Sequence, residues 1–415
     1  MIADTDKRIP PVGRISLRGL GGSETALAFL AFIVLALLPI FVSGYPIYIL
    51  PQYMLFGMMA MSLGLLWGFV GILSFGQAGF FALGAYTMGL AMQSDLGINP
   101  AYIGMLLSLV AGGVLAAITG YFLFSVGVRA TYFVLVTLAL SIMVEQIAVS
   151  QSDITGGWNG MFIDRMSLTF GALGDISLSE DAPAYYAVLP VVVVTYILLR
   201  WLTSARFGKV LAGIRENEER LTALGFSISL YKTCAFALSG AIASFAGALY
   251  GTHANFVAPS LGGVLFSTEV VVWVAIGGRN SLLGALLGGI LVATLSNYLS
   301  TITPEYWQLV LGLIFIVVII FFKGGIKYLV DCLVKTCVNH FKTGIPQSQG
   351  DHLCAPIVAV ETWFRYENPY RFCWHVLLRT HLYFLRCAGT PISRAMLVRS
   401  ISDVPPPYNR KRASR

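Results

Sequence analysis

The feature that most constrains this chain is a succession of apolar runs, each long enough or nearly long enough to cross a lipid bilayer. A membrane-spanning helix needs about 20 predominantly apolar residues. Nine runs approach or exceed that length: 25–43, 47–69, 74–93, 101–126, 131–150, 184–200, 232–251, 282–300 and 305–322. A tenth run, 264–277, is shorter and is followed by glycine, which predicts a half-span or a broken helix. The pattern predicts an all-α polytopic membrane protein with about 8–10 transmembrane elements.

Composition supports the membrane class and also separates a tail from the rest of the chain. Hydrophobic residues make up 57% and charged residues 11%, whereas soluble domains contain about 25% charged residues. Residues 1–330 contain fifteen basic and fifteen acidic side chains, and residues 331–415 contain twelve basic and five acidic ones. The whole net charge of +7 therefore belongs to the tail.

The composition predicts three regions. Residues 1–24 are polar and basic, 25–326 form the membrane domain, and 327–415 form a basic tail with five of the six cysteines and four of the five histidines. The cysteine and histidine spacings of the tail fit no metal site, so no metal is expected. Two interpretations of the tail stay open: a disordered basic extension, and out-of-frame translation after a shift near residue 330.

The distribution of positive charge predicts the orientation in the membrane. With a cytosolic N-terminus, fourteen of the fifteen basic residues in 1–330 fall on the cytosolic side, and only Arg165 falls outside. The long loop 151–183 is then outside and is acidic. This asymmetry is what the positive-inside rule describes, so a multi-pass protein with a cytosolic N-terminus is expected.

One charged segment interrupts the apolar runs on the predicted cytosolic side. This segment, 200–232, is called the island here, and it contains six basic and three acidic residues. The periodicity from Ser204 to Leu224 predicts a helix with an apolar stripe beside its charges, formed by Val210, Leu211, Ile214, Leu221 and Leu224. Such a helix suits the groove of a soluble partner. The alternative is that its stripe packs on the protein's own bundle.

A few polar side chains lie within the apolar runs and are candidates for a solute pathway. They are Ser74, Gln77, Glu145 and Glu269, and such groups are costly in a membrane unless they face a cavity or a partner. Ser74 and Gln77, three residues apart, are expected on one helical face. The alternative is that these groups form hydrogen bonds between helices. His253 is expected in an outside loop, exposed to solvent.

Motifs for catalysis and nucleotide binding are missing from the sequence. It contains no GxxxxGK[ST] phosphate loop, no HExxH motif and no nucleophile elbow. The basic tail matches no nucleic-acid-binding module. We therefore expect a protein that is not an enzyme, binds no cofactor and no nucleic acid, and works within the lipid bilayer.

Four stretches, in order, resemble the permease subunits of ABC importers for branched-chain amino acids and urea. The first covers Gly71, Leu73, Ser74, Gly76, Gln77, Ala78, Phe80, Gly84, Ala85 and Tyr86. The second is Thr155-Gly156-Gly157-Trp158-Asn159-Gly160. The third is the island motif Gly208, Leu211, Ile214, Arg215, Glu216, Glu218, Leu224 and Gly225, with Gly213 and Leu221 as departures. The fourth runs from Ala235 to Tyr250 and is followed by Gly277-Gly278.

The resemblance implies an ABC importer permease fold in a bacterial plasma (inner) membrane. It also implies a heteromeric machine with a second permease subunit, two cytosolic ATPase subunits that bind the ATP, and an extracytoplasmic substrate-binding protein. The island motif would then couple to the ATPase, and Thr155, Gly156 and Gly157 would join the translocation pathway. The expected substrate is a branched-chain amino acid, with urea or a short amide as the alternative. A secondary transporter or channel working alone is a further alternative, and it would require internal repeats and ion-coupling carboxylates.

Overall fold

The computed structural model describes residues 17–41, 44–94, 99–128, 130–165, 167–169, 175–177, 181–302 and 304–321. The chain divides into two compact units, Met1–Val334 and Lys335–Arg415, and every described residue belongs to the first. The predicted tail 327–415, residues 1–16 of the predicted N-terminal segment and parts of the loop 151–183 lie outside the described residues.

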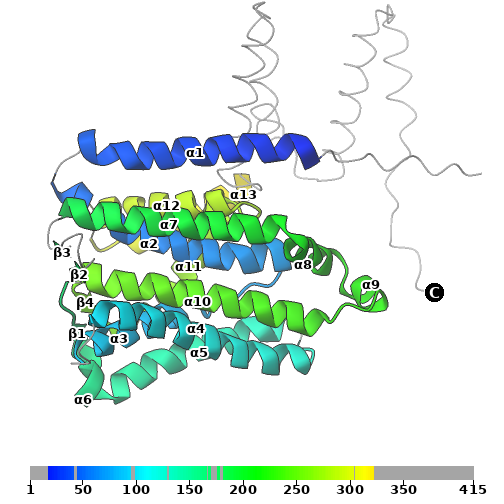
Figure 1. The fold of residues 1–415 in the computed structure, drawn as a ribbon, viewed down its shortest axis with the longest axis horizontal. Helices are drawn as coiled ribbons and strands as arrows, with labels where there is room; N and C mark the ends of the chain where they lie inside the picture. Colours follow the sequence, from blue (N-terminus) through cyan, green and yellow to red (C-terminus); the bar gives the residue numbers. More distant parts are fainter. Residues whose placement is uncertain are drawn as a thin grey trace, which may run out of the picture. The chain divides into compact units, whose positions relative to one another are not determined.

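The described part of the chain is mainly helical. Its longer helices are α1 (Leu17–Phe41), α2 (Tyr45–Gly64), α3 (Gln77–Met92), α4 (Pro100–Ser125), α5 (Ala130–Ser150), α7 (Asp181–Ser204), α10 (Ile228–Ala254), α11 (Val264–Gly277), α12 (Leu282–Ile302) and α13 (Trp307–Phe321). These helices lie roughly parallel or antiparallel in a layered bundle (Figure 1). Among the described residues, six helices are long and apolar enough to cross a membrane: α2 with its continuation, α4, α5, α7, α10 and α12.

Each predicted apolar run coincides with a helix, and the short run 264–277 is α11. The predicted and observed helix ends differ most where a helix continues into polar residues, because hydropathy marks only the end of the apolar run. α1 begins at Leu17 rather than at residue 25. α3 begins at Gln77, so the expectation that Ser74 shares a helical face with Gln77 is wrong. Residues 71–76 form an irregular segment before the helix.

Helix α10 packs closely on α3 and α4 through small residues. A methyl group on Gly84 of α3 would lie 1.8 Å from the carbonyl oxygen of Ser244, and one on Gly247 of α10 would lie 1.9 Å from that of Phe81. The Ser244 hydroxyl donates to the Ser108 carbonyl of α4 at 2.6 Å. In lipid, where apolar surface gains little by leaving the solvent, this close backbone approach provides the packing between helices.

Helix α2 changes its winding near its end. It continues into the π-helix η1 (Leu65–Val70), which ends at Gly71 in a left-handed conformation with φ 84°. The N–H groups of Gly71 and Ile72 both donate to the carbonyl of Leu66, at 2.9 and 3.2 Å. π-helical turns leave the regular hydrogen-bond ladder and often occur at functional sites.

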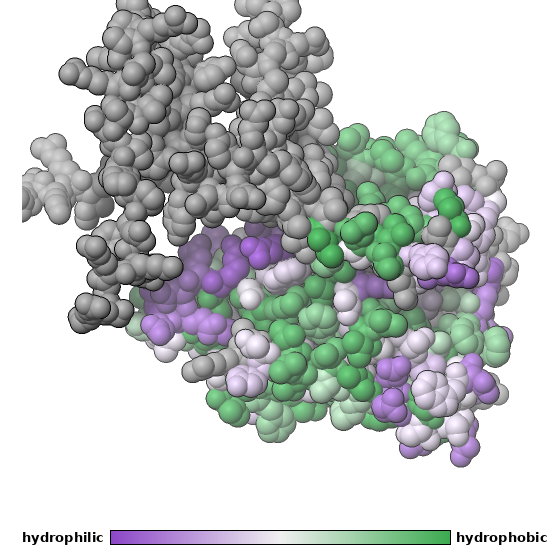
Figure 2. Space-filling model, turned by 180° about the vertical axis from the view of Figure 1, so that it is seen from behind, coloured by the Kyte–Doolittle hydropathy of each residue, from purple (hydrophilic) through white to green (hydrophobic). Residues whose placement is uncertain are grey.

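The bundle has two different ends. One bears α6 (Ser152–Thr155), η2 (Gly157–Asn159) and two small antiparallel sheets, in which β1 (Met161–Phe162) pairs with β4 (Phe256–Val257) and β2 (Ser167–Thr169) with β3 (Asp175–Ser177). The 3-10 turn η4 (Pro259–Gly262) leads from there into α11. The other end bears α8 (Arg206–Glu216) and α9 (Glu218–Ala223) (Figure 1). Between the two ends lies a largely hydrophobic surface (Figure 2).

The close contact between α3 and α10 generates a stability prediction. Gly84→Ala places a methyl group against the Ser244 backbone, and overpacking of this kind costs roughly 1–3 kcal/mol. The matched control is Gly312→Ala in α13, because no atom lies within 4 Å of a methyl group there. The control should be neutral or stabilised by up to about 1 kcal/mol, since alanine favours helix. Thermal unfolding of both purified variants checks this, and equal melting temperatures would contradict the packing described.

Candidate coupling and pathway sites

The island folds as two helices rather than the single helix expected from its periodicity. α8 ends at Glu216 because Asn217 adopts an extended conformation with φ −161° and ψ 105°. The Asn217 side chain then caps α9 by accepting a hydrogen bond from the N–H of Arg220 at 2.9 Å. Asparagine is a preferred N-cap residue. The expectation of one continuous helix from Ser204 to Leu224 is therefore wrong.

The apolar stripe of the island packs mainly on the protein's own bundle. Leu211 and Ile214 are fully buried in the core that also contains Leu66 and Val70 of the α2 and η1 region. Val210 and Leu221 are partly buried against the same core. The interpretation that this stripe lies in a partner's groove is wrong for Leu211 and Ile214, which the bundle encloses. Leu224 differs, because 68% of its surface is exposed.

The exposed side of α8 and α9 is charged, with one large apolar side chain at its tip. The island surface is defined here by Arg206, Lys209, Glu216, Glu219, Arg220 and Leu224, all of which are exposed. Leu224 precedes Gly225, which turns the chain with φ 86°. In Figure 2, hydrophilic residues gather at both ends of the molecule, one of which bears α8 and α9. This surface suits a soluble, charged partner better than lipid.

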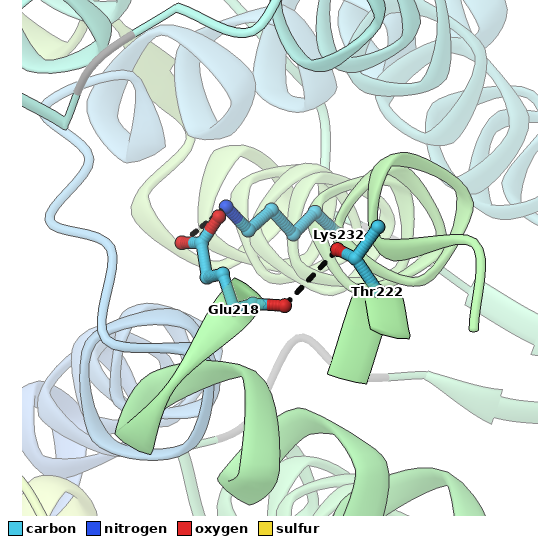
Figure 3. Close-up of polar contacts among 3 residues, drawn as sticks. All are labelled: Glu218, Thr222 and Lys232. Atoms are coloured by element: carbon cyan, nitrogen blue, oxygen red, sulfur yellow. Dashed lines mark hydrogen bonds and ion pairs between the residues drawn. The ribbon is translucent and has the colours of Figure 1, made fainter. Parts of the chain in front are cut away.

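Glu218, one of the predicted coupling residues, has bonding partners within this chain, although its side chain is 55% exposed. Its carboxylate forms an ion pair with the Lys232 ammonium of α10 at 2.6 Å (Figure 3). The backbone carbonyl of Glu218 accepts a hydrogen bond from the Thr222 hydroxyl at 3.0 Å. The Lys232 ammonium also lies 5.7 Å from the ring centroid of Phe124 in α4. These contacts fasten α9 to the ends of α4 and α10.

Arg215, another predicted coupling residue, points toward the bundle. Its Nη1 atom donates to the backbone carbonyl of Gly68 in η1 and to Oδ1 of Asn280, the latter at 3.1 Å. Asn280 lies in the turn between α11 and α12. A methyl group on Gly71 would lie 2.7 Å from Cγ of Arg215. The contacts of Arg215 therefore join three segments that are far apart in the sequence.

Gln77 lies in a hydrogen-bonded cluster between three helices. Its side-chain oxygen accepts from the Ser62 hydroxyl of α2 at 3.0 Å, and its amide nitrogen donates to the Ser239 hydroxyl of α10 at 3.0 Å. The Ser239 hydroxyl in turn donates to the Ser62 carbonyl at 2.7 Å. Gln77 is only 1% exposed. Of the two interpretations of Gln77, these contacts favour a link between helices over a wall of a pathway.

Ser74 stabilises the irregular segment before α3. Its hydroxyl accepts a hydrogen bond from the N–H of Gly76 at 3.1 Å, and the neighbouring N–H of Phe75 donates to the Thr137 hydroxyl of α5 at 3.2 Å. Ser74 is fully buried. Sequence reasoning missed Thr137, Ser62 and Ser239, because single hydroxyl residues are common in apolar helices and nothing in their spacing distinguishes them.

The two predicted pathway carboxylates lie on α5 and α11, which are neighbours. The Ser141 hydroxyl of α5 donates to the Gly262 carbonyl at 2.7 Å and lies 3.1 Å from the Ser267 hydroxyl of α11. One turn along α5, the Glu145 carboxylate is close to Gly263, where an added methyl group would lie 3.3 Å from Oε2. Glu145 and Glu269 are both partly exposed. Their helices thus present acidic groups at an incompletely covered face.

Thr155, Gly156 and Gly157 form a tight turn at the β1–β4 end. Gly156 and Gly157 have φ values of 75° and 57°, which glycine adopts at low cost. A methyl group on Gly156 would lie 2.0 Å from the Gly160 carbonyl oxygen. The Thr155 hydroxyl donates to the Gln151 carbonyl at 2.8 Å. The motif therefore has a local structural reason, independent of a role in the pathway.

His253 is buried, contrary to the expectation of a solvated loop residue. It lies in the last turn of α10, is 8% exposed, and its Nε2 atom is 2.8 Å from the Tyr48 carbonyl oxygen of α2. The ring of Tyr48 lies 5.6 Å from that of His253, and the Arg165 guanidinium lies 5.9 Å from the Tyr48 ring. The helix is longer than its apolar run, which is why the sequence placed His253 in a loop.

The bundle of spanning helices and the charged island are those of a polytopic membrane protein, and comparison with known proteins specifies its family. The model of the family described as branched-chain amino acid transport system / permease component matches residues 45–319. The chain belongs to this family. It is accordingly a multi-pass membrane protein of a transport class and not itself an enzyme.

Several curated proteins are similar to the chain. The high-affinity branched-chain amino acid transport system permease protein LivM of Escherichia coli is 29% identical over 324 residues, covering 72% of this chain and 74% of LivM. LivH of Salmonella typhimurium is 22% identical over 285 residues, covering 65% of this chain and 90% of LivH. The xylose transport system permease protein XylH of Escherichia coli is 29% identical over 157 residues, covering 35% and 39%. No solved structure matches the chain significantly.

The Gln77 cluster generates the second prediction. Gln77→Leu removes two buried hydrogen bonds, which are worth about 1 kcal/mol each. The melting temperature should therefore fall, while uptake per folded complex should stay the same because Gln77 is enclosed. Both quantities are measured on one purified preparation. An unchanged melting temperature with impaired uptake would instead assign Gln77 to the pathway.

Proposed function

We propose that this chain is the membrane-spanning permease subunit of an ATP-driven importer for branched-chain amino acids, located in the plasma (inner) membrane with its N-terminus in the cytosol. The observation on which the proposal rests is the island. Its apolar side chains Leu211 and Ile214 are buried in the bundle, whereas its charges and Leu224 are exposed at one end. A soluble ATPase subunit is a partner that such a surface suits. The ATP would be bound by two such subunits and not by this chain.

The structure supports a specific docking mode. Exposed charges beside Leu224, with the exposed Phe226 and Leu230 following it in the sequence, match the general anatomy of interfaces, in which an apolar anchor enters a pocket and a polar rim surrounds it. Leu224 is the anchor in this proposal, and Lys209 and Glu216 belong to the rim. Glu218 and Arg215 instead hold the island in place through Lys232 and Asn280. The eight island residues that resemble the family motif thus divide into contact and support roles.

The similarity to LivM supports the proposed substrate, because LivM matches twice as much of this chain as XylH does, 72% against 35%. The shorter match to XylH shows that related permeases are named for chemically different solutes. The similarity to both LivM and LivH supports a second, homologous permease subunit beside this one. An extracytoplasmic binding protein would then deliver the solute at the β1–β4 end.

The face of α5 and α11 is the proposed contribution to the pathway. Glu145 and Glu269 are partly exposed there, and a carboxylate facing lipid would be costly. Contact with the second permease subunit, across a shared aqueous pathway, removes that cost. The side chains of Ser74, Gln77 and Thr155 form hydrogen bonds within this chain. Their proposed role is therefore to stabilise the helices and turns that line the pathway.

The docking mode is tested by Leu224→Asp in the complex assembled with its ATPase, second permease and binding-protein subunits. Burying a charge where an apolar anchor belongs should weaken ATPase binding at least about tenfold, or ~1.4 kcal/mol. The matched control is Ile154→Asp, which alters an exposed apolar residue at the opposite end. Co-purification of the ATPase with the tagged permease is the measurement. Equal recovery from both variants would contradict docking at the island.

The substrate is tested by uptake into proteoliposomes that contain the same complex. Labelled leucine should be taken up with ATP, and unlabelled isoleucine or valine should compete with it. Urea and xylose in equal excess should not compete. Competition by urea with none by isoleucine would overturn the proposed substrate while leaving the importer class intact.

A further inference from the structure

Arg215 occupies a junction of three segments that the proposed coupling movement would have to connect. The Arg215 junction is defined here as Arg215 of α8, Gly68 and Gly71 at the end of η1, and Asn280 in the turn between α11 and α12. One guanidinium nitrogen donates to the Gly68 carbonyl and to the Asn280 side chain. Arg215 is thus the residue through which α8 reaches both other segments by directional bonds.

The Gly68 carbonyl is available to Arg215 because of the π-helical turn. In a continuing α-helix, the N–H of Ile72 would donate to the Gly68 carbonyl. Here Ile72 donates instead to the Leu66 carbonyl, at 3.2 Å. A carbonyl at a helix end requires another donor, and Arg215 supplies it. The carbonyl that the π-helical winding of η1 leaves free is therefore bonded to a residue of the island.

The junction is closely fitted around the arginine. A methyl group added to Gly71 would lie 2.7 Å from Cγ of Arg215. A methyl group added to Gly68 would lie 2.0 Å from the Arg279 carbonyl oxygen, so η1 also touches the α11–α12 turn directly. Both bonds come from the Nη1 atom, whose group is planar and rigid, whereas a lysine ammonium is a compact donor on a flexible stem. Lysine should therefore hold the two acceptors less firmly.

The remaining contacts of α8 with the bundle are mainly apolar. Leu211 and Ile214 are buried in the core, but apolar contacts are non-directional and permit packed helices to slide by small amounts. Directional hydrogen bonds at the Arg215 junction resist such sliding. α2 is the most buried of the six long helices, so a displacement at its end reaches the centre of the bundle.

We propose that Arg215 is the positioning residue that transmits displacement of α8 into the membrane domain, by holding the end of η1 and the α11–α12 turn together. This inference rests on the proposed function, because the displacement is attributed to the ATPase. It departs from the sequence expectation, in which Arg215 contacts the ATPase itself. In the structure its guanidinium is engaged with the bundle.

The test compares four variants in the reconstituted complex: Arg215→Ala, Arg215→Lys, Asn280→Ala and the control Gly312→Ala. Gly312 lies in α13, where no atom is within 4 Å of an added methyl group. For each variant, ATPase recovery, melting temperature, ATP hydrolysis and leucine uptake are measured. The deciding quantity is the number of leucine molecules taken up per ATP hydrolysed.

Arg215→Ala should retain the ATPase and hydrolyse ATP, but uptake per ATP should fall by about tenfold, the effect expected for loss of charge-assisted hydrogen bonds. Arg215→Lys and Asn280→Ala should each cause a smaller loss, about threefold, because each leaves one of the two bonds. Gly312→Ala should leave both ATPase recovery and uptake per ATP unchanged.

Two results would overturn the proposal. One is wild-type uptake per ATP in Arg215→Ala, and the other is loss of the ATPase from Arg215→Ala at an unchanged melting temperature, which would make Arg215 a docking residue. If Arg215→Ala unfolds, Asn280→Ala decides, since it leaves α8 unaltered. Wild-type uptake per ATP in Asn280→Ala then counts against the junction.

Hydrogen exchange separates this inference from the proposed function, because it needs no ATPase. In the permease domain of Arg215→Ala, the amides of 71–76 and 278–281 should exchange faster than in the wild type, since two segments lose a shared anchor. Gly312→Ala should leave these amides unchanged. Unaltered exchange in Arg215→Ala refutes the junction. Normal ATPase recovery in Leu224→Asp would refute only the docking at the island and would leave the Arg215 junction untouched.

Discussion

The structure depends on how closely α10 approaches α3 and α4. Apolar side chains gain nothing by leaving lipid for protein, so a membrane bundle relies on close contacts and on hydrogen bonds between helices. Gly84 and Gly247 let the backbones of α3 and α10 touch, and Ser239, Ser244 and Gln77 form hydrogen bonds across the same surfaces. The glycines that the sequence shows at short spacings are explained by these contacts. A rigid centre of this kind can pass a displacement from one end to the other.

One side of the island packs on this part of the bundle, and the other side is exposed and is the proposed contact surface. Leu211 and Ile214 fix its position in the core, Lys232 with Glu218 fastens its second helix, and Arg215 joins it to η1 and the α11–α12 turn. The exposed remainder is mainly polar and charged, with Leu224 as an exposed apolar side chain just after α9. An element held at three places and exposed along its outer side is suited to receive force from a partner and deliver it to several helices at once.

Much of the fold could be predicted from the sequence, because long apolar runs leave few alternatives in a bilayer. The sequence predicts a half-span or broken helix at 264–277, where the structure has the 14-residue helix α11, and it predicts a helical island. What failed depended on three-dimensional neighbours. Asn217 ends the first island helix by capping α9. The apolar stripe faces the bundle, and periodicity alone cannot tell which neighbour a stripe faces. His253 is covered by Tyr48, from a helix that is far away in the sequence. The π-helical end of α2 and the contact of Arg215 with Asn280 have no signal in hydropathy, since both depend on where the Arg215 side chain reaches.

The account depends most directly on the island being the surface that meets the ATPase. A photoreactive amino acid placed at Leu224 in the assembled importer should form a cross-link to the ATPase subunit on illumination. The same group placed at Trp158, which is exposed at the opposite end, should form none. A cross-link to the ATPase from Trp158, with none from Leu224, would contradict the account.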